Sequence, residues 1–145
     1  MEPVRVIPAQ TLVIECACDF AAIAQACWDI RSFLTKAGLS EPELSKWWLA
    51  LTEAGNNAVK HVNDSGRQFP VRFEIQVNRS AVEVRILDHT PPGFEFPKQA
   101  VLPADVLSEK GRGLYIIQKY TDFQSYERGA GQNCMILRKG RESCP

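Results

Sequence analysis

The stretch that most constrains this chain is residues 44–62, where apolar side chains recur every three or four positions. This spacing predicts a helix with one buried side. The buried side would consist of Leu44, Trp47, Trp48, Leu51, Gly55, Ala58 and Val62. Glu53, Asn57 and Lys60 fall on the opposite side, and a separation of four residues places the Glu53 carboxylate beside the Asn57 amide.

The polar side of this helix has two possible explanations. Gly55, Asn56 and Asn57 are poor helix formers, so the helix gives up intrinsic stability for another purpose. Close packing of small residues with solvated amides is one explanation. A ligand site on the polar side is the other, and the helix alone leaves both open.

The length of 145 residues fits a single domain, and we expect residues 1–145 to form one, with a frayed tail over residues 139–145. The formal net charge of zero argues against direct contact with nucleic acid. No apolar run is long enough to span a membrane, and residues 1–10 lack the pattern of a signal peptide. We therefore expect a cytoplasmic protein whose five cysteines are reduced thiols without zinc spacing.

Local signals place the first elements of the chain. Residues 11–18 are rich in Val, Ile and Leu and predict an edge strand. Asp19 is expected to cap the helix that follows, and Gly38 is typical of the end of such a helix. Ser40 and Glu43 form a capping box, which predicts where the central helix begins.

Residues 71–77 and 82–87 alternate between apolar and other side chains, which predicts a hairpin with one buried face. Asp88 follows in phase with Val84 and Ile86, so it would point to the same face as the core. A carboxylate there is costly unless hydrogen-bond donors reach it. The alternative is that the strand has already ended and Asp88 caps a turn.

Residues 95–110 show weak periodicity, and a connection of this length is usually functional or mobile. Gly111 and Gly113 then open a helix whose apolar residues follow at helical spacing. The free amides and positive dipole end of a helix N-terminus suit phosphate oxygens, and glycine lets those oxygens approach the backbone. A lone G-x-G is a weak signal by itself. Residues 122–128 and 133–139 predict a second hairpin.

Three motifs, in this order along the chain, resemble the GHKL or Bergerat-type ATP-binding superfamily, which includes histidine kinases and DNA gyrase. Glu-Ala-Gly-Asn-Asn-Ala-Val-Lys-His at residues 53–61 resembles its N-box. Asp88 with Gly93-Phe94 resembles the adenine-pocket box, and Gly-Arg-Gly-Leu-Tyr-Ile-Ile at residues 111–117 resembles the phosphate-lid box. The chain looks most like the anti-sigma-factor serine/threonine kinases. The resemblance implies an α+β fold, a Bergerat-type two-layer sandwich with a mixed, mostly antiparallel sheet and helices packed on one face.

The resemblance also implies roles for single residues, with ATP or ADP and Mg²⁺ as cofactors. Asn57 would hold Mg²⁺, and Glu53 would act as the base toward an acceptor hydroxyl. Asp88 would accept a hydrogen bond from the adenine amino group, and Gly93 would line that pocket. Histidine-kinase domains usually carry Asn at the position of Glu53, so a carboxylate there favours a hydroxyl acceptor or water.

The phosphate lid is the second group of residues to which the resemblance gives a role. Gly111 and Gly113 would let the lid backbone wrap the phosphates, with Leu114 in the same nucleotide-binding segment. Lys60 and Arg112 are weaker candidates for neutralising phosphate charge.

The implied function is an ATP-dependent serine/threonine protein kinase that also acts as an anti-sigma factor in a partner-switching module. Its substrate would be a STAS-domain anti-sigma-factor antagonist, its target a sigma factor or a functional equivalent, and a homodimer using Trp28 and Phe33 is plausible. One departure concerns the adenine pocket, because the family usually has glycine where this chain has Thr90, followed by two prolines. Two alternatives therefore stay open: a non-catalytic protein-binding module with a degenerate nucleotide pocket, and a stand-alone histidine-kinase-like ATPase domain.

Overall fold

The computed structural model describes residues 9–60, 62, 68–89, 112–128 and 132–142. The elements in chain order are β1 (Gln10–Cys16), α1 (Phe20–Lys36), α2 (Glu41–Lys60), β2 (Val71–Val77), β3 (Ala81–Asp88), α3 (Arg112–Tyr120), β4 (Phe123–Arg128) and β5 (Asn133–Gly140). None of the helices in the described part of the chain is long and apolar enough to cross a membrane.

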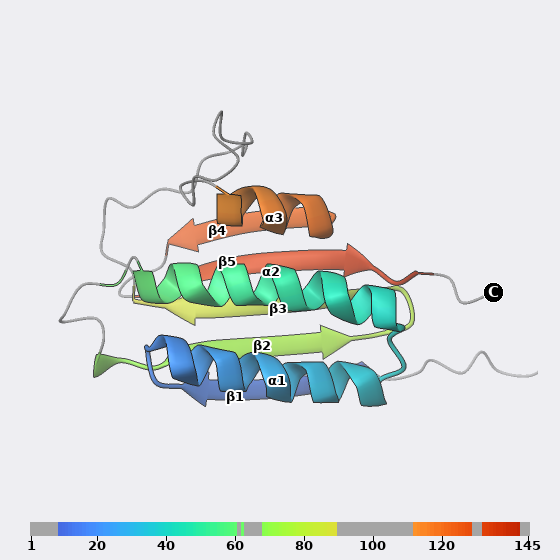
Figure 1. The fold of residues 1–145 in the computed structure, drawn as a ribbon, viewed down its shortest axis with the longest axis horizontal. Coiled ribbons are helices and arrows are strands. Elements are labelled where there is room, and N and C mark those ends of the chain that lie inside the picture. The colour runs from blue at the N-terminus through green and yellow to red at the C-terminus, as the bar shows by residue number, and fades with distance from the viewer. Residues whose placement is uncertain (1–8, 61, 63–67, 90–111, 129–131, 143–145) are drawn as a thin grey trace, which may run out of the picture.

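The five described strands form one sheet in the order β1-β2-β3-β5-β4. All four pairings are antiparallel, so the mostly antiparallel sheet of the prediction contains no parallel pair among the described strands. The three helices cover one face of this sheet, with α2 between α1 and α3 (Figure 1). The predicted α+β two-layer sandwich is therefore confirmed, and β1 is an edge strand as expected.

The core lies between the helices and the sheet. Buried and more exposed residues alternate along β2 and β3, and the buried set is apolar except for Asp88 at the end of β3. The helices fill the other side of the core with Ile30 and Leu34 of α1 and Trp47 and Leu51 of α2, each no more than 2 % exposed. The periodicity read from the sequence thus decides which face of each element is buried.

The predicted boundary signals of α1 are confirmed. The Asp19 carboxylate accepts a hydrogen bond from the backbone N–H of Ala22 at 2.7 Å, as an N-cap residue does. At the other end Gly38 has a positive φ of 95°, and the N–H of Leu39 donates to the carbonyl of Leu34. Glycine suits this left-handed turn because it has no Cβ to clash with the backbone.

Trp48 departs from the predicted buried side of α2. It is only half-buried, and its ring packs against the exposed ring of Trp28, with 4.8 Å between the centroids. The reason is that α1 runs alongside α2 and leaves a seam between the two helices that faces solvent. The prediction that Trp48 is fully buried is therefore wrong.

The thiols are placed as the sequence suggested. Cys18 and Cys27 are buried, and the four described cysteines form no disulfide. Burial raises the pKa of the Cys27 thiol to about 11, with a smaller opposing contribution from a hydrogen bond to Thr52. Cys27 is therefore a protonated, apolar packing residue at neutral pH.

The start of α2 is tied to the end of the sheet through one buried carboxylate. Glu43, which is 3 % exposed, accepts a hydrogen bond from the N–H of Ser40 at 3.0 Å, and its own N–H donates to the Ser40 hydroxyl at 3.3 Å. This reciprocal pair is the predicted capping box. The other Glu43 oxygen accepts from the N–H of Glu142 at 3.1 Å.

This contact corrects the expectation of a frayed tail from residue 139 onward. β5 continues through Gly140, and the N–H of Arg141 donates to the carbonyl of Ser80 at 2.8 Å. Residues 143–145 lie outside the described part of the chain.

Replacing Glu43 with Ala is expected to lower the free energy of unfolding by about 1–2 kcal/mol at neutral pH, because the capping box and a buried acceptor are both lost. Burial raises the pKa of Glu43, but the hydrogen bonds from Ser40 and Glu142 and the charge of Arg141 together hold it below the ordinary 4.5. The folded state thus favours the carboxylate. Its stabilisation is complete above that ordinary value and disappears as the pH falls through the lower folded-state pKa.

Urea unfolding of wild type and variant at neutral pH and at about pH 3 measures this difference and its loss in acid. Glu41→Ala is the control, since Glu41 is an exposed residue of the same helical turn with one ion pair to Arg31. It should change the free energy of unfolding by less than about 0.5 kcal/mol. Equal losses in the two variants would contradict the role assigned to Glu43.

Candidate functional site

Four chain segments meet at one end of the molecule. The C-terminal ends of α2 and β3 and the N-terminal ends of α3 and β5 all lie on the left in Figure 1. These are the segments in which the sequence motifs fall, because Glu53 and Asn57 belong to the second half of α2 and Asp88 ends β3. The fold therefore brings the N-box, the strand-end aspartate and the glycine-opened helix to the same end.

Glu53 is half-buried and lies against the first turn of α3. A Cβ atom added at Gly113 would fall 2.5 Å from the Glu53 Oε2 atom, well inside any real contact. The missing side chain at residue 113 is therefore what leaves room for the carboxylate. The sequence suggested a phosphate contact for this glycine, and the structure gives it a second task.

The position of Glu53 also has an electrostatic consequence. The first turn of α3 carries backbone N–H groups without helical partners and the positive end of the helix dipole. A carboxylate beside such a turn is stabilised by roughly 0.3–1 kcal/mol. Gly113, the second residue of α3, thus places the Glu53 oxygen where a negative charge is favoured.

Asp88 is the last residue of β3 and is only 5 % exposed, so the alternative that it caps a turn beyond the strand is wrong. Its Cα partner across the ladder is Asn133, the first residue of β5. The Asn133 Nδ2 atom donates to the Asp88 Oδ1 atom at 3.3 Å, and Asn133 is itself 7 % exposed. This amide meets part of the hydrogen-bonding need that the sequence assigned to a buried carboxylate.

Asn133 is a residue that the sequence analysis missed. It stands at the start of the second strand of the second predicted hairpin, two residues before the buried Met135 and in the same phase. A polar residue in phase with the buried residues of the strand was a signal from which Asn133 could have been found. Its pairing with Asp88 could not be predicted, because the register between β3 and β5 joins strands that are far apart in the sequence.

An aromatic pair adjoins Asp88. The ring of His89 stacks on the ring of Phe69 with 4.5 Å between centroids and 22° between planes. The Nδ1 atom of His89 is buried and has no hydrogen-bond partner among the described residues. Phe69, by contrast, is 46 % exposed. The two stacked rings therefore lie at the end of β3 that carries Asp88.

The other predicted site residues are placed as follows. Asn57 is half-buried on α2, four residues after Glu53, and Lys60 is the exposed last residue of that helix. Leu114 is half-buried on α3. Gly93, Gly111 and the side chain of Arg112 lie outside the described residues, as do the segment Thr90-Pro91-Pro92 and His61.

The donor set of the described residues fits a magnesium–nucleotide complex better than a protein-only metal centre. No group of three or more His, Cys, Asp or Glu side chains that would hold a metal ion is found in the described ranges. Mg²⁺ in nucleotide sites usually takes one or two protein oxygens and completes its shell with phosphate and water. The amide oxygen of Asn57, half-buried beside Glu53, is a donor of that kind.

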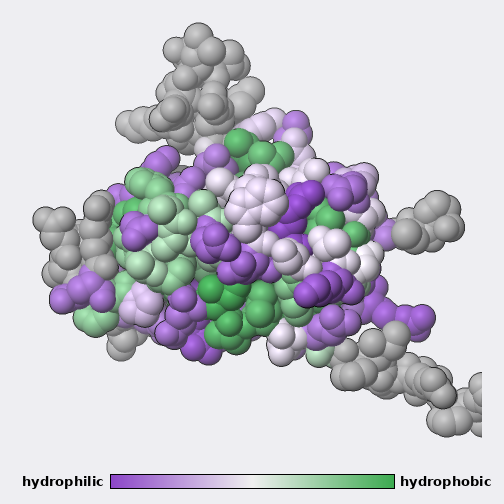
Figure 2. Space-filling view, turned by 60° about the horizontal axis from the view of Figure 1, so that its bottom comes forward, coloured by the Kyte–Doolittle hydropathy of each residue, from purple (hydrophilic) through white to green (hydrophobic). Residues whose placement is uncertain are grey.

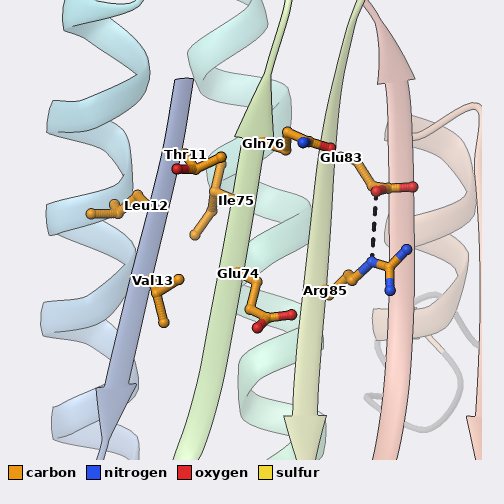
Figure 3. Close-up of a pocket in the computed structure, with 8 residues that line it drawn as sticks. All are labelled: Thr11, Leu12, Val13, Glu74, Ile75, Gln76, Glu83 and Arg85. Carbon is orange, nitrogen blue, oxygen red and sulfur yellow. Dashed lines mark ion pairs between the residues drawn. The ribbon is translucent and has the colours of Figure 1, made fainter. Parts of the chain in front are cut away.

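A cavity of about 470 Å³ lies elsewhere, on the face of the sheet that the helices leave open (Figure 3). Val13, Glu74 and Arg85 are successive cross-strand partners there, and Arg85 Nε lies 3.6 Å from a Glu83 oxygen. Two carboxylates beside a single guanidinium do not suit a triphosphate. We therefore place the candidate nucleotide site at the motif-bearing end of the helical layer and not in this cavity.

Comparison with known proteins agrees with this geometry. Residues 16–139 match the family model of the histidine kinase-like ATPase domain. This match spans most of the chain, so the protein belongs to the histidine kinase-like ATPase domain family. Membership implies a nucleotide-binding domain. No curated protein sequence matches the chain.

Solved structures with the same fold include two that share 16 % sequence identity with this chain. One contains the RsbU and RsbW domains of Rv1364c from Mycobacterium tuberculosis, with a TM-score of 0.67 over 92 % of this chain. The match spans about a third of that longer protein, 34 %. The other is the SiaB–SiaC complex from Pseudomonas aeruginosa, with a TM-score of 0.58 and 89 % of each chain covered. At this identity the likeness establishes the fold.

Two glycine substitutions separate packing from positioning. A Cβ at Gly55 would lie 2.6 Å from the Cγ2 methyl of Ile23, which α1 holds in the core, so Gly55→Ala is expected to lower the free energy of unfolding by about 1–3 kcal/mol. A Cβ at Gly113 meets only the free end of Glu53, which turns aside easily. Gly113→Ala should therefore change stability by less than about 0.5 kcal/mol while moving the carboxylate.

Urea unfolding measures the two stabilities, and the side-chain carboxyl signal of Glu53 in carbon-13 NMR reports its displacement. The Gly55→Ala spectrum serves as the control, because Gly55 packs toward α1 and the sheet. An unmoved Glu53 signal in Gly113→Ala would contradict the close approach of Glu53 to α3.

Proposed function

We propose that this protein transfers the γ-phosphoryl group of ATP to a serine or threonine hydroxyl of a STAS-domain antagonist, and that it acts as an anti-sigma factor in a partner-switching module. The single observation that carries the proposal is the Glu53 carboxylate, half-buried on α2 and set against the first turn of α3. A carboxylate at this position of the N-box suits an acceptor that must lose a proton. An imidazole acceptor has no such need.

Each candidate site residue would have its own role in phosphoryl transfer. Asn57 would hold the Mg²⁺ ion of the magnesium–nucleotide complex, and Asp88, oriented by Asn133, would accept from the adenine amino group. Gly111 and Gly113 would let the lid backbone reach the phosphates. Bound Mg²⁺ would supply charge neutralisation, which is most of what a loose phosphoryl-transfer transition state requires.

Glu53 would take the proton of the acceptor hydroxyl as the hydroxyl oxygen forms its bond to the γ-phosphorus. The bond from that phosphorus to the bridging oxygen breaks, and ADP leaves with the electron pair. The proton on Glu53 then passes to solvent. Lys60, exposed at the end of α2, and Arg112 at the start of α3 are available to offset phosphate charge.

Two named structures lend support at the level of the fold. Solved structures with this architecture include one that contains an RsbW domain and one of the SiaB–SiaC complex. The resemblance of residues 53–61 to the N-box of anti-sigma-factor kinases adds the sequence argument. A sigma factor, or a target with the same role, would then be the second partner of the switch.

The test of catalysis is Glu53→Gln. The amide keeps the size of the side chain and cannot take a proton, so kcat for phosphorylation of a candidate STAS-domain protein is expected to fall at least about 100-fold. The ATP dissociation constant should stay within about twofold, because Glu53 would not bind the nucleotide. Radiolabelled ATP and phosphoamino-acid analysis measure transfer, and calorimetry measures binding.

The Glu53→Gln control is Glu41→Gln, an exposed carboxylate on the same helix. It should leave both constants unchanged. Transfer by Glu53→Gln at the wild-type rate would remove Glu53 as the base. Phosphorylation of a histidine in the partner would favour the stand-alone histidine-kinase-like domain.

Nucleotide binding is tested at Asp88. Asp88→Ala removes a buried acceptor, and the ATP dissociation constant is expected to rise at least about tenfold, which corresponds to roughly 1.4 kcal/mol. Asp29→Ala, at an exposed position of α1, is the control and should bind as wild type does. A wild-type protein without measurable ATP binding would instead favour the non-catalytic protein-binding module.

A further inference from the structure

The helical side of the molecule exposes large apolar side chains. Trp28 is 56 % exposed, Phe20 51 % and Leu49 41 %, and all three lie on α1 or α2. The segments around them, residues 20–28 and 47–52, contain no charged residue. Figure 2 shows pale green, moderately hydrophobic surface gathered at the end of the molecule where α1 begins.

The open face of the sheet is a contrasting surface. Arg72 pairs there with Glu15 at 3.1 Å and with Glu74 at 3.0 Å, and Arg138 pairs with Glu83 at 2.6 Å. Such cross-strand ion pairs are typical of a solvated face. Exposed apolar side chains of a monomer are usually scattered singly, and a continuous group of them marks an interaction surface.

Apolar side chains of α1 and α2 meet at the seam between the two helices. The rings of Trp28 and Trp48 lie 4.8 Å apart, and Leu49 follows Trp48 on α2. We call Phe20, Trp28, Trp48 and Leu49 the tryptophan patch. Aromatic residues of this kind dominate the binding energy of protein interfaces when a partner covers them.

The tryptophan patch adjoins the candidate catalytic carboxylate. Leu49 precedes Glu53 by four residues and so lies one helical turn, about 6 Å, along the same side of α2. On α1, Ile23 lies against Gly55, which puts the start of α1 beside the residues that follow Glu53. The patch and the carboxylate therefore belong to one surface.

We propose that the tryptophan patch is the docking surface for the protein substrate, the STAS-domain protein that carries the acceptor hydroxyl. This inference rests on the proposed function. A standard interface covers about 800 Å² on each partner, which corresponds to a disc of roughly 16 Å radius. A folded protein that places a hydroxyl at Glu53 must then cover Leu49 and, beside it, Trp48 and Trp28. The absence of charge in residues 20–28 and 47–52 means that the matching surface of the substrate is apolar.

The first test is steady-state kinetics with the full chain and the same candidate STAS-domain protein. Trp28→Ser and Leu49→Ser are expected to raise KM for that protein at least about tenfold, with kcat within about twofold. Val13→Ser and Phe123→Ser are matched controls, since these residues are 50 % and 44 % exposed on the open face of the sheet. Both controls should keep the wild-type KM. Circular dichroism and ATP calorimetry report whether each variant is folded.

The second test measures docking without transfer. Calorimetric titration of the STAS-domain protein into each variant, with ADP present, is expected to show the same loss of affinity for Trp28→Ser and Leu49→Ser. Normal transfer by the wild type with unchanged KM in both patch variants would overturn the docking surface and leave the proposed function standing. Binding that depends on the patch, without any transfer by the wild type, would overturn the kinase and support the docking surface.

The oligomeric state shows whether the tryptophan patch is covered by a second copy of the chain or by the protein substrate. Light scattering of wild type and patch variants is expected to give the same mass for all. A dimer that becomes a monomer in Trp28→Ser, with unchanged affinity for the STAS-domain protein, would assign the patch to self-association and overturn the proposal.

Discussion

The structure depends on how closely two helices approach α2. On one side Gly55 lets α1 come within contact of its backbone, since any Cβ would strike the Ile23 side chain. On the other side Gly113 lets the first turn of α3 close over Glu53. Both contacts use the absence of a side chain, yet one serves the core and the other places a carboxylate. The sequence left two explanations open for the poor helix formers of α2. Close packing explains Gly55, and a ligand role is proposed for Asn57.

Local patterns predicted most of the fold, because they record which face of each element is apolar. The caps at Asp19 and Ser40, the burial of Asp88 and the ends of β2 and β3 all follow from signals within a few residues. Pairings between distant segments could not be predicted in this way. The contact of Asn133 with Asp88 depends on register across the sheet, and that of Glu53 with α3 on how two helices pack.

The two faces of the molecule differ in the kinds of side chain that they expose. Ion pairs occupy the open face of the sheet, whereas large apolar side chains are exposed on α1 and α2 near the Glu53 carboxylate. Helix α2 contributes both to the core and to the candidate site. Its inner side packs into the core through Trp47, and its outer side carries the residues proposed for phosphoryl transfer. The family match spans residues 16–139, which include all three helices and most of the sheet, so this arrangement is the architecture of the family.

The bond from Glu142 to Glu43 spans 99 residues of sequence, and it bears on how the protein is made. During synthesis, the residues that begin α2 emerge long before the segment that completes their hydrogen bonds. A nascent chain can form the α1 and α2 hairpin early, but its buried acid must wait for almost the whole sheet to be translated. Until then the ribosome presents a helical pair with exposed tryptophans, which is the kind of surface that chaperones recognise.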